Sequence, residues 1–145
     1  MTSLVHKARK SLQVLWASPW TLPGLLVGLL VLATGGGWRR LPAAVGFYGG
    51  AAAWLLRKVP LIGGASALTL GHVILARSAD LLESTWPHEA VHVRQYERWG
   101  IFFVPAYFLC MIVLVCRRRH PYFDNPFERQ AYDIAGDGLR GKTRS

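Results

Sequence analysis

Long uncharged stretches separated by small basic clusters dominate the pattern of hydrophobic and polar positions. No charged residue occurs between Val14 and Trp38, a run of 25 residues. About 20 apolar residues cross the hydrocarbon core of a bilayer, so this run is long enough even with two prolines near its start. It favours a retained membrane anchor over a cleaved signal peptide, because the residues that follow are not the small ones of a cleavage site.

Three shorter uncharged runs follow. Leu41–Leu56 is interrupted by glycines, and it predicts either a second, short membrane helix or a hairpin leading into a domain. Glycines and a proline in 59–76 argue against a helix, and its segment 67–75 predicts a strand with a nearby partner. Ile101–Cys116 is rich in Phe, Leu and Val, but its 16 residues are fewer than a membrane span usually has.

The composition also indicates a membrane protein, because 52% of the residues are hydrophobic and only 17% are charged. The net charge of +9 could suggest nucleic acid, but the basic residues form clusters that bracket the apolar runs. These clusters are Lys7, Arg9 and Lys10, Arg39 and Arg40, Arg57 and Lys58, and Arg117 to Arg119. Anionic lipid, and not nucleic acid, is therefore the expected partner. Cys110 and Cys116 fall on different faces of a helix, so no disulfide and no metal ligand is expected there.

The segment 88–100 contains His-Glu-x-x-His. At about 100° per residue, His88 and His92 lie one turn apart on one face of a helix, so both imidazoles can reach one metal ion. Glu89 lies beside them, where it can accept a proton from a metal-bound water. Gln95 shares their face, and it either supports the metal site or is simply exposed.

The flanking residues set the expected limits of this helix. Pro87 suits its first turn, Ser84 or Thr85 can cap it, and Gly100 can terminate it. The residues before it, from Ser78, are expected to form a loop or a short turn.

Glu128 is the natural third ligand, because a catalytic zinc usually has three protein ligands and carboxylates are scarce after the motif. Asn125 and Pro126 predict the N-cap and first residue of a new helix, which makes Glu128 its third residue. Glu97 is five residues from His92 and points elsewhere. The alternative for Glu128 is to bond the amide of Asn125 as a capping-box glutamate.

His88, Glu89 and His92, followed by Glu128 on a later helix, resemble the gluzincin branch of zinc metallopeptidases. In that family an upstream strand edge holds the substrate, and Leu68–Leu75 is the matching segment here. The stretches 71–74, 88–96 and 125–128 are also similar to a group of small, uncharacterised bacterial membrane proteins. The resemblance covers residues 67–132, but the chain is much smaller than the well-known peptidases and has no large second lobe.

The resemblance implies metal-assisted hydrolysis. Zinc held by His88, His92 and Glu128 would lower the pKa of its water and polarise the substrate carbonyl, while Glu89 acts as base and then as proton donor to the leaving amine. A partner for the oxyanion is also expected. The candidates for that role or for support of the ligands are His72, His120, Tyr122 and Tyr132, together with Gln95 and Asn125.

We therefore expect a membrane-associated α+β fold. It would have an N-terminal transmembrane helix or helical hairpin, a short β hairpin or edge strand, the His-Glu-x-x-His helix, an apolar core helix and a C-terminal helix with Glu128. Residues 1–40 would form a basic N-terminus and anchor, 41–136 a minimal zinc-peptidase-like domain and 137–145 a flexible tail. The favoured function is a zinc metallopeptidase that cleaves peptides or proteins near the bilayer. The alternatives are a metal-binding membrane protein without turnover and an incidental motif.

The topology follows from Ile101–Cys116. If this run crossed the bilayer, the histidines and Glu128 would lie on opposite sides and could not share a metal ion. The residues 117–128 can reach back about 40 Å, but three arginines would not return through lipid. A core or half-inserted helix beside the metal helix is therefore expected, with the site on one face of a bacterial inner membrane. The arginines favour the cytoplasmic face.

Overall fold

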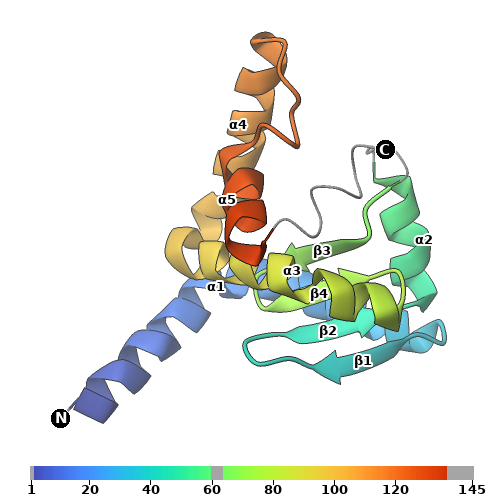
Figure 1. Cartoon of the computed structure of the whole chain (residues 1–145). Helices are drawn as coiled ribbons and strands as arrows, with labels where there is room; N and C mark the ends of the chain where they lie inside the picture. The colour runs from blue at the N-terminus through green and yellow to red at the C-terminus, as the bar shows by residue number, and fades with distance from the viewer. Residues whose placement is uncertain (1, 60–63, 137–145) are drawn as a thin grey trace.

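The computed structural model describes residues 2–59 and 64–136, so the expected flexible tail 137–145 lies outside the described residues. The protein is an α+β structure in which helices cover a mixed four-stranded sheet (Figure 1). Its elements are α1 (Thr2–Ala33), β1 (Gly37–Arg40), β2 (Val45–Tyr48), α2 (Gly50–Lys58), β3 (Ala67–Leu70), β4 (Val73–Ala76), α3 (Ala79–Trp99), the 3-10 turn η1 (Gly100–Phe102), α4 (Phe103–Cys116) and α5 (Pro126–Ala135).

The strands lie in the order β1-β2-β4-β3. β1 and β2 form an antiparallel hairpin, β2 and β4 are parallel, and β3 and β4 form a second antiparallel hairpin. The strand expected over 67–75 is thus two strands, which Gly71 and His72 connect. Gly71 has φ +60°, and a side chain there would meet Thr21 of α1, so only glycine suits this turn. The arrangement leaves β3 as an edge strand beside α3.

One face of α1 packs on the sheet. The buried positions Gly24, Gly28 and Val31 recur every three to four residues, as on one side of a helix. Gly28 allows the closest approach, because a side chain there would overlap the ring of Phe47. The predicted anchor is therefore joined to the sheet, and β1, from the same N-terminal segment, pairs with β2.

Gly28→Ala is expected to destabilise the protein by about 1–2 kcal/mol. Overpacking costs about 1–3 kcal/mol, and alanine returns about 1 kcal/mol through its higher helix propensity. Leu26→Ala, on the outward face of α1, is the control and should leave the stability of the sheet unchanged. The measurement is urea unfolding in detergent. Equal stability of both variants would mean that α1 does not pack on the sheet.

Of the two alternatives for Leu41–Leu56, the membrane helix is wrong, because the segment forms β2, which pairs with β1 in a hairpin, and most of the short α2. The expected start of the His-Glu-x-x-His helix is also wrong. The His-Glu-x-x-His helix, α3, begins at Ala79, so Pro87 lies inside it and the expected loop is helical. Ser78 is the N-cap and accepts a hydrogen bond from the amide of Leu81 at 3.2 Å. The additional turns bury Leu82 against the sheet, which offsets the hydrogen bond that Pro87 cannot donate.

The end of α3 at Gly100 is confirmed, since the C-cap glycine has φ +56°. The segment after it forms η1 and α4, but α4 is not a core helix, because only Phe103 and Leu114 of its residues are buried. Two helical stretches, Lys10–Ala33 and Ala79–Cys116, are long and apolar enough to cross a membrane. The apolar side chains of α4 therefore lie mostly on the surface of the protein and not in its interior. That α4 is half inserted into a membrane stays a prediction.

Candidate metal centre

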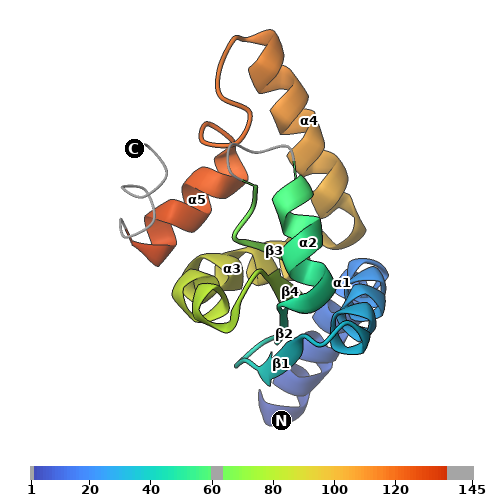
Figure 2. The same cartoon turned by 90° about the vertical axis from the view of Figure 1, so that its right-hand side faces the viewer.

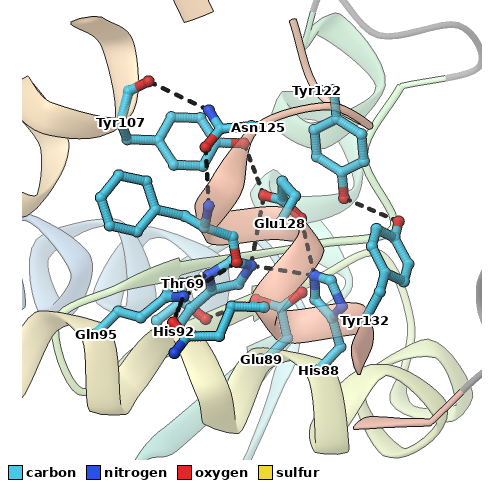
Figure 3. A network of polar contacts seen from close by, with 12 residues as sticks. Thr69, His88, Glu89, His92, Gln95, Tyr107, Tyr122, Asn125, Glu128 and Tyr132 are labelled. Carbon is cyan, nitrogen blue, oxygen red and sulfur yellow. Dashed lines mark hydrogen bonds and ion pairs between the residues drawn. The ribbon is translucent and has the colours of Figure 1, made fainter. Parts of the chain in front are cut away.

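α3 and α5 bring the three predicted ligands together (Figure 3). The Nε2 atom of His88 lies 3.1 Å from Nε2 of His92 and 3.1 Å from Oε2 of Glu128. His92 Nε2 is 3.5 Å from the other carboxylate oxygen. All three side chains are buried. They converge on one point, so this group could hold a metal ion.

The separations suit a tetrahedral metal ion. Zinc binds imidazole nitrogen and carboxylate oxygen at about 2.0–2.2 Å, which puts neighbouring ligand atoms of a tetrahedron about 3.3 Å apart. The three distances between His88, His92 and Glu128 lie on either side of that value. Two neutral imidazoles and one carboxylate also form one of the recurring donor sets for catalytic zinc. The residues present therefore fit the ion that the sequence predicts.

Gln95 orients His92. Its Oε1 lies 2.8 Å from His92 Nδ1, which donates the hydrogen bond and so directs the free Nε2 lone pair into the site. The Gln95 amide donates in turn to the carbonyl of Phe127 and to Gln130 on α5. Gln95 is buried, so of its two sequence interpretations the exposed one is wrong.

His88 is held differently. The ring of Tyr132 lies 4.7 Å from its ring, between centroids. Its Nδ1 atom is buried and has no hydrogen-bond partner among residues 2–59 and 64–136. The contacts of Nε2 with Glu128 and His92, together with packing against Tyr132, therefore fix the orientation of this imidazole.

Two neighbours position Glu128. Asn125 caps α5, because its side chain accepts a hydrogen bond from the amide of Phe127 at 3.1 Å. The amide of Asn125 itself donates to the carbonyl of Tyr122, so the capping-box alternative for Glu128 is wrong. Tyr107 of α4 donates its hydroxyl to Oε1 of Glu128 at 2.7 Å. Sequence reasoning missed Tyr107, although a hydroxyl in an apolar run must find a partner.

Glu89 lies buried on α3, one residue from His88. Its Oε2 accepts a hydrogen bond from the hydroxyl of Thr69 at 2.6 Å. The carbonyl of Thr69 accepts one from Tyr96 at 3.1 Å. Thr69 belongs to the edge strand β3 and was also missed by sequence reasoning. It ties the carboxylate of Glu89 to the strand that runs beside the site.

The charges of the ligands are strongly coupled. Burial opposes protonation of His92, but the hydrogen bond and the charge of Glu128 outweigh it and raise the pKa of His92 to about 9. Burial would raise the pKa of Glu128, yet hydrogen bonds with His88 and His92 hold it far below its usual range. Without a metal ion, His92 is thus an imidazolium paired with a carboxylate near neutral pH.

Metal uptake is therefore expected to release a proton near pH 7. Metal binds neutral imidazole, so protons compete for His92 below its pKa of about 9. The apparent zinc affinity should rise about tenfold per pH unit up to about pH 9 and then level off. Titration calorimetry in two buffers of different ionisation enthalpy measures the released proton. An affinity that is unchanged between pH 7 and 9 would contradict the pairing of His92 with Glu128.

The remaining predicted residues separate into two groups. Tyr122 and Tyr132 lie at the site, with their hydroxyls 3.4 Å apart. His72 does not, because its Nε2 lies 3.1 Å from Glu97 and its amide donates to Thr21 of α1. That pairing also accounts for Glu97, which points away from the metal ligands as expected.

His120 also lies outside the site. It is exposed, and its Nδ1 accepts hydrogen bonds from the amides of Tyr122 and Phe123. These bonds shape the turn between α4 and α5. Cys110 and Cys116 are free thiols, as expected from their spacing.

Comparisons with known proteins add no assignment. No protein-family model, no curated protein and no solved structure matches the chain.

Proposed function

We propose that the protein is a zinc-dependent metallopeptidase of the gluzincin type, held at a membrane, that hydrolyses peptide bonds near the bilayer. The observation that carries this proposal is the convergence of His88, His92 and Glu128 beside the buried carboxylate of Glu89. Arg117 to Arg119 favour the cytoplasmic face for this site.

The chemistry is divided among a few residues. Bound zinc would supply a Lewis acid, held by His88, His92 and Glu128. Glu89 would take the proton from the attacking water and pass it to the leaving nitrogen, while Thr69 holds its carboxylate in place. Tyr122 and Tyr132 lie beside the ligands and do not donate to Glu128, so their hydroxyls are the candidates to donate to the oxyanion.

β3 offers a place for the peptide. It is an edge strand beside α3, and apart from the carbonyl of Thr69, to which Tyr96 donates, its outer backbone groups can pair with an extended chain. Thr69 lies in this strand and also contacts Glu89. A peptide added to β3 would thus run past the proposed general base.

A second function is favoured by the burial of the ligands. His88, His92 and Glu128 are only 4%, 7% and 3% exposed, which also suits a closed metal site that stabilises the fold without turnover. Such a protein would act as an adaptor or structural membrane component.

Metal content and hydrolysis of the full chain distinguish the two. The chain, purified in detergent without added metal, is analysed for zinc and incubated with a mixture of peptides, whose products are identified by mass spectrometry. The proposal expects one zinc per chain and cleavage that a chelator stops and added zinc restores. One zinc without any cleavage would support the second function. A chain that does not bind zinc would refute both.

A further inference from the structure

α1 and the segment formed by η1 and α4 present apolar faces on the same side of the molecule. Figure 2 shows both helices on the right, with α3 and α5 on the left. The helices meet at η1, where the rings of Trp16 and Phe102 lie 6.1 Å apart and Trp20 donates a hydrogen bond to the carbonyl of Ile101. Trp16 and Phe102 are themselves exposed, so the apolar surface continues from one helix to the other.

The outward side chains of both helices are large and apolar. On α1, Leu15, Leu22 and Leu29 are 69%, 61% and 62% exposed, and they follow one another at seven-residue spacing on one face. On α4, Phe108 and Val115 are 56% and 59% exposed at the same spacing. A soluble monomer rarely exposes a continuous apolar surface of this extent, so another apolar phase must cover it.

The packing of α1 on the sheet excludes a crossing of the bilayer. α1 is in contact with all four strands, so a crossing α1 would carry the sheet into the hydrocarbon. No strand pairs with the outer edge of β1 among the described residues, and open sheet edges do not occur exposed to lipid. β1 also carries Arg39 and Arg40, both exposed and both costly to bury in lipid. The helix must therefore lie along the membrane surface.

The length and the end of α4 exclude a crossing as well. Its 14 residues extend about 21 Å, which is less than the hydrocarbon thickness of about 30 Å. It ends at three exposed arginines, and the chain turns at Arg118, with φ +55°, and returns to place Glu128 against His88. A helix that entered the bilayer end-on would leave Arg117 to Arg119 in the hydrocarbon.

We propose that the protein lies on a single anionic leaflet, with α1 and α4 in the plane of the membrane and no segment of 10–116 crossing it. Amphipathic surfaces of this kind bury apolar side chains to about 5–10 Å and place cations among the headgroups. Lys10 is exposed in the N-terminal part of α1, Arg117 is exposed directly after α4, and the net charge of +9 favours anionic lipid. The inference rests on the membrane attachment in the proposed function but not on zinc or hydrolysis.

Depth measurements with spin labels test this arrangement. The full chain, with Cys110→Ser and Cys116→Ser, receives one cysteine in place of Leu15, Leu22, Leu29, Phe108 or Val115. Each labelled protein is bound to vesicles of phosphatidylcholine and phosphatidylglycerol. Relaxation of the label by oxygen and by a water-soluble nickel chelate then gives its depth. Circular dichroism checks that each variant is folded. Leu26→Cys, on the outward surface of α1, replaces any variant that fails this check. Glu83→Cys is the control on the opposite helix layer, since the Glu83 side chain is 76% exposed.

The arrangement in the plane of the membrane predicts similar, shallow depths for the labels at 15, 22 and 29 and an aqueous label at 83. Across a bilayer, the labels at 15 and 29 would differ in depth by about 21 Å, and such a gradient would overturn the proposal. Labels reached by neither reagent and coupled to one another would show that a second copy covers the face. Aqueous labels throughout would show that no membrane binds. None of these depth measurements requires zinc. The protein can therefore lie in the plane of the membrane without hydrolysing peptides, and it can hydrolyse peptides without lying in that plane.

Discussion

Glu89→Gln is expected to lower the rate of peptide hydrolysis by about 10²–10⁴-fold while the protein keeps its zinc. The amide cannot accept the proton of the attacking water, and general-base catalysis contributes a factor of this size. Glu89 is not among the residues that converge on the metal position, so its replacement leaves all three ligands in place. The measurements are kcat on a peptide cleaved by the wild type and zinc per chain.

Glu83→Gln is the matched control for this variant. Glu83 lies on the same helix, but it is exposed and pairs with Arg39 on β1 at 3.3 Å. An exposed pair of this kind contributes little to stability, so the variant should hydrolyse peptide at the normal rate. Normal turnover by Glu89→Gln would instead show that another group accepts the proton.

Local periodicity explains why much of the site could be predicted from sequence. Two histidines at i and i+4 share a helix face wherever the helix begins. The prediction that His88 and His92 lie together was therefore not affected when the start of α3 was placed too late in the sequence. Glu128 followed from the scarcity of carboxylates after the motif, and the N-cap and proline before it placed it in a new helix, α5. Neither inference needed a contact between distant segments of the chain.

Long-range contacts explain what was missed. Thr69 reaches Glu89 because β3 and α3 pack together, and Tyr107 reaches Glu128 because the chain turns back after α4. No spacing in the sequence encodes either distance. The segment of β1 was assigned to the end of the anchor. It is short and contains two arginines, and it forms a strand only because it pairs with β2 in the folded protein.

The close packing of α1 on the sheet was not foreseen either. Hydropathy records that α1 is apolar, but not that two of its glycines face a sheet. Gly24 and Gly28 are four residues apart, and a side chain at either would overlap Val73 or Phe47. Small residues at this spacing allow close packing in soluble and membrane proteins alike, so the pattern does not distinguish a helix that crosses a bilayer from one that carries a sheet.

Glu128→Ala is expected to weaken zinc binding by about 100- to 1,000-fold. Structural zinc sites gain about 10–16 kcal/mol from four ligands, so one ligand accounts for about 2.5–4 kcal/mol. In this protein the loss is reinforced, because the alanine removes the only carboxylate of the described ligand group and leaves two imidazoles around the ion. Competition with a zinc-binding dye at fixed pH measures the affinity.

Tyr107→Phe gives the graded comparison, because it keeps the carboxylate and removes only the hydrogen bond to Oε1 of Glu128. Residues that support a metal ligand typically change affinity by about 10–100-fold, so this variant should fall between Glu128→Ala and the wild type. Glu128→Ala with wild-type affinity would mean that a residue other than Glu128 completes the site. Equal losses in both variants would mean that Tyr107 acts on the fold of α4 and α5 rather than on the ligand, and the thermal stability of the metal-free variants separates these two cases.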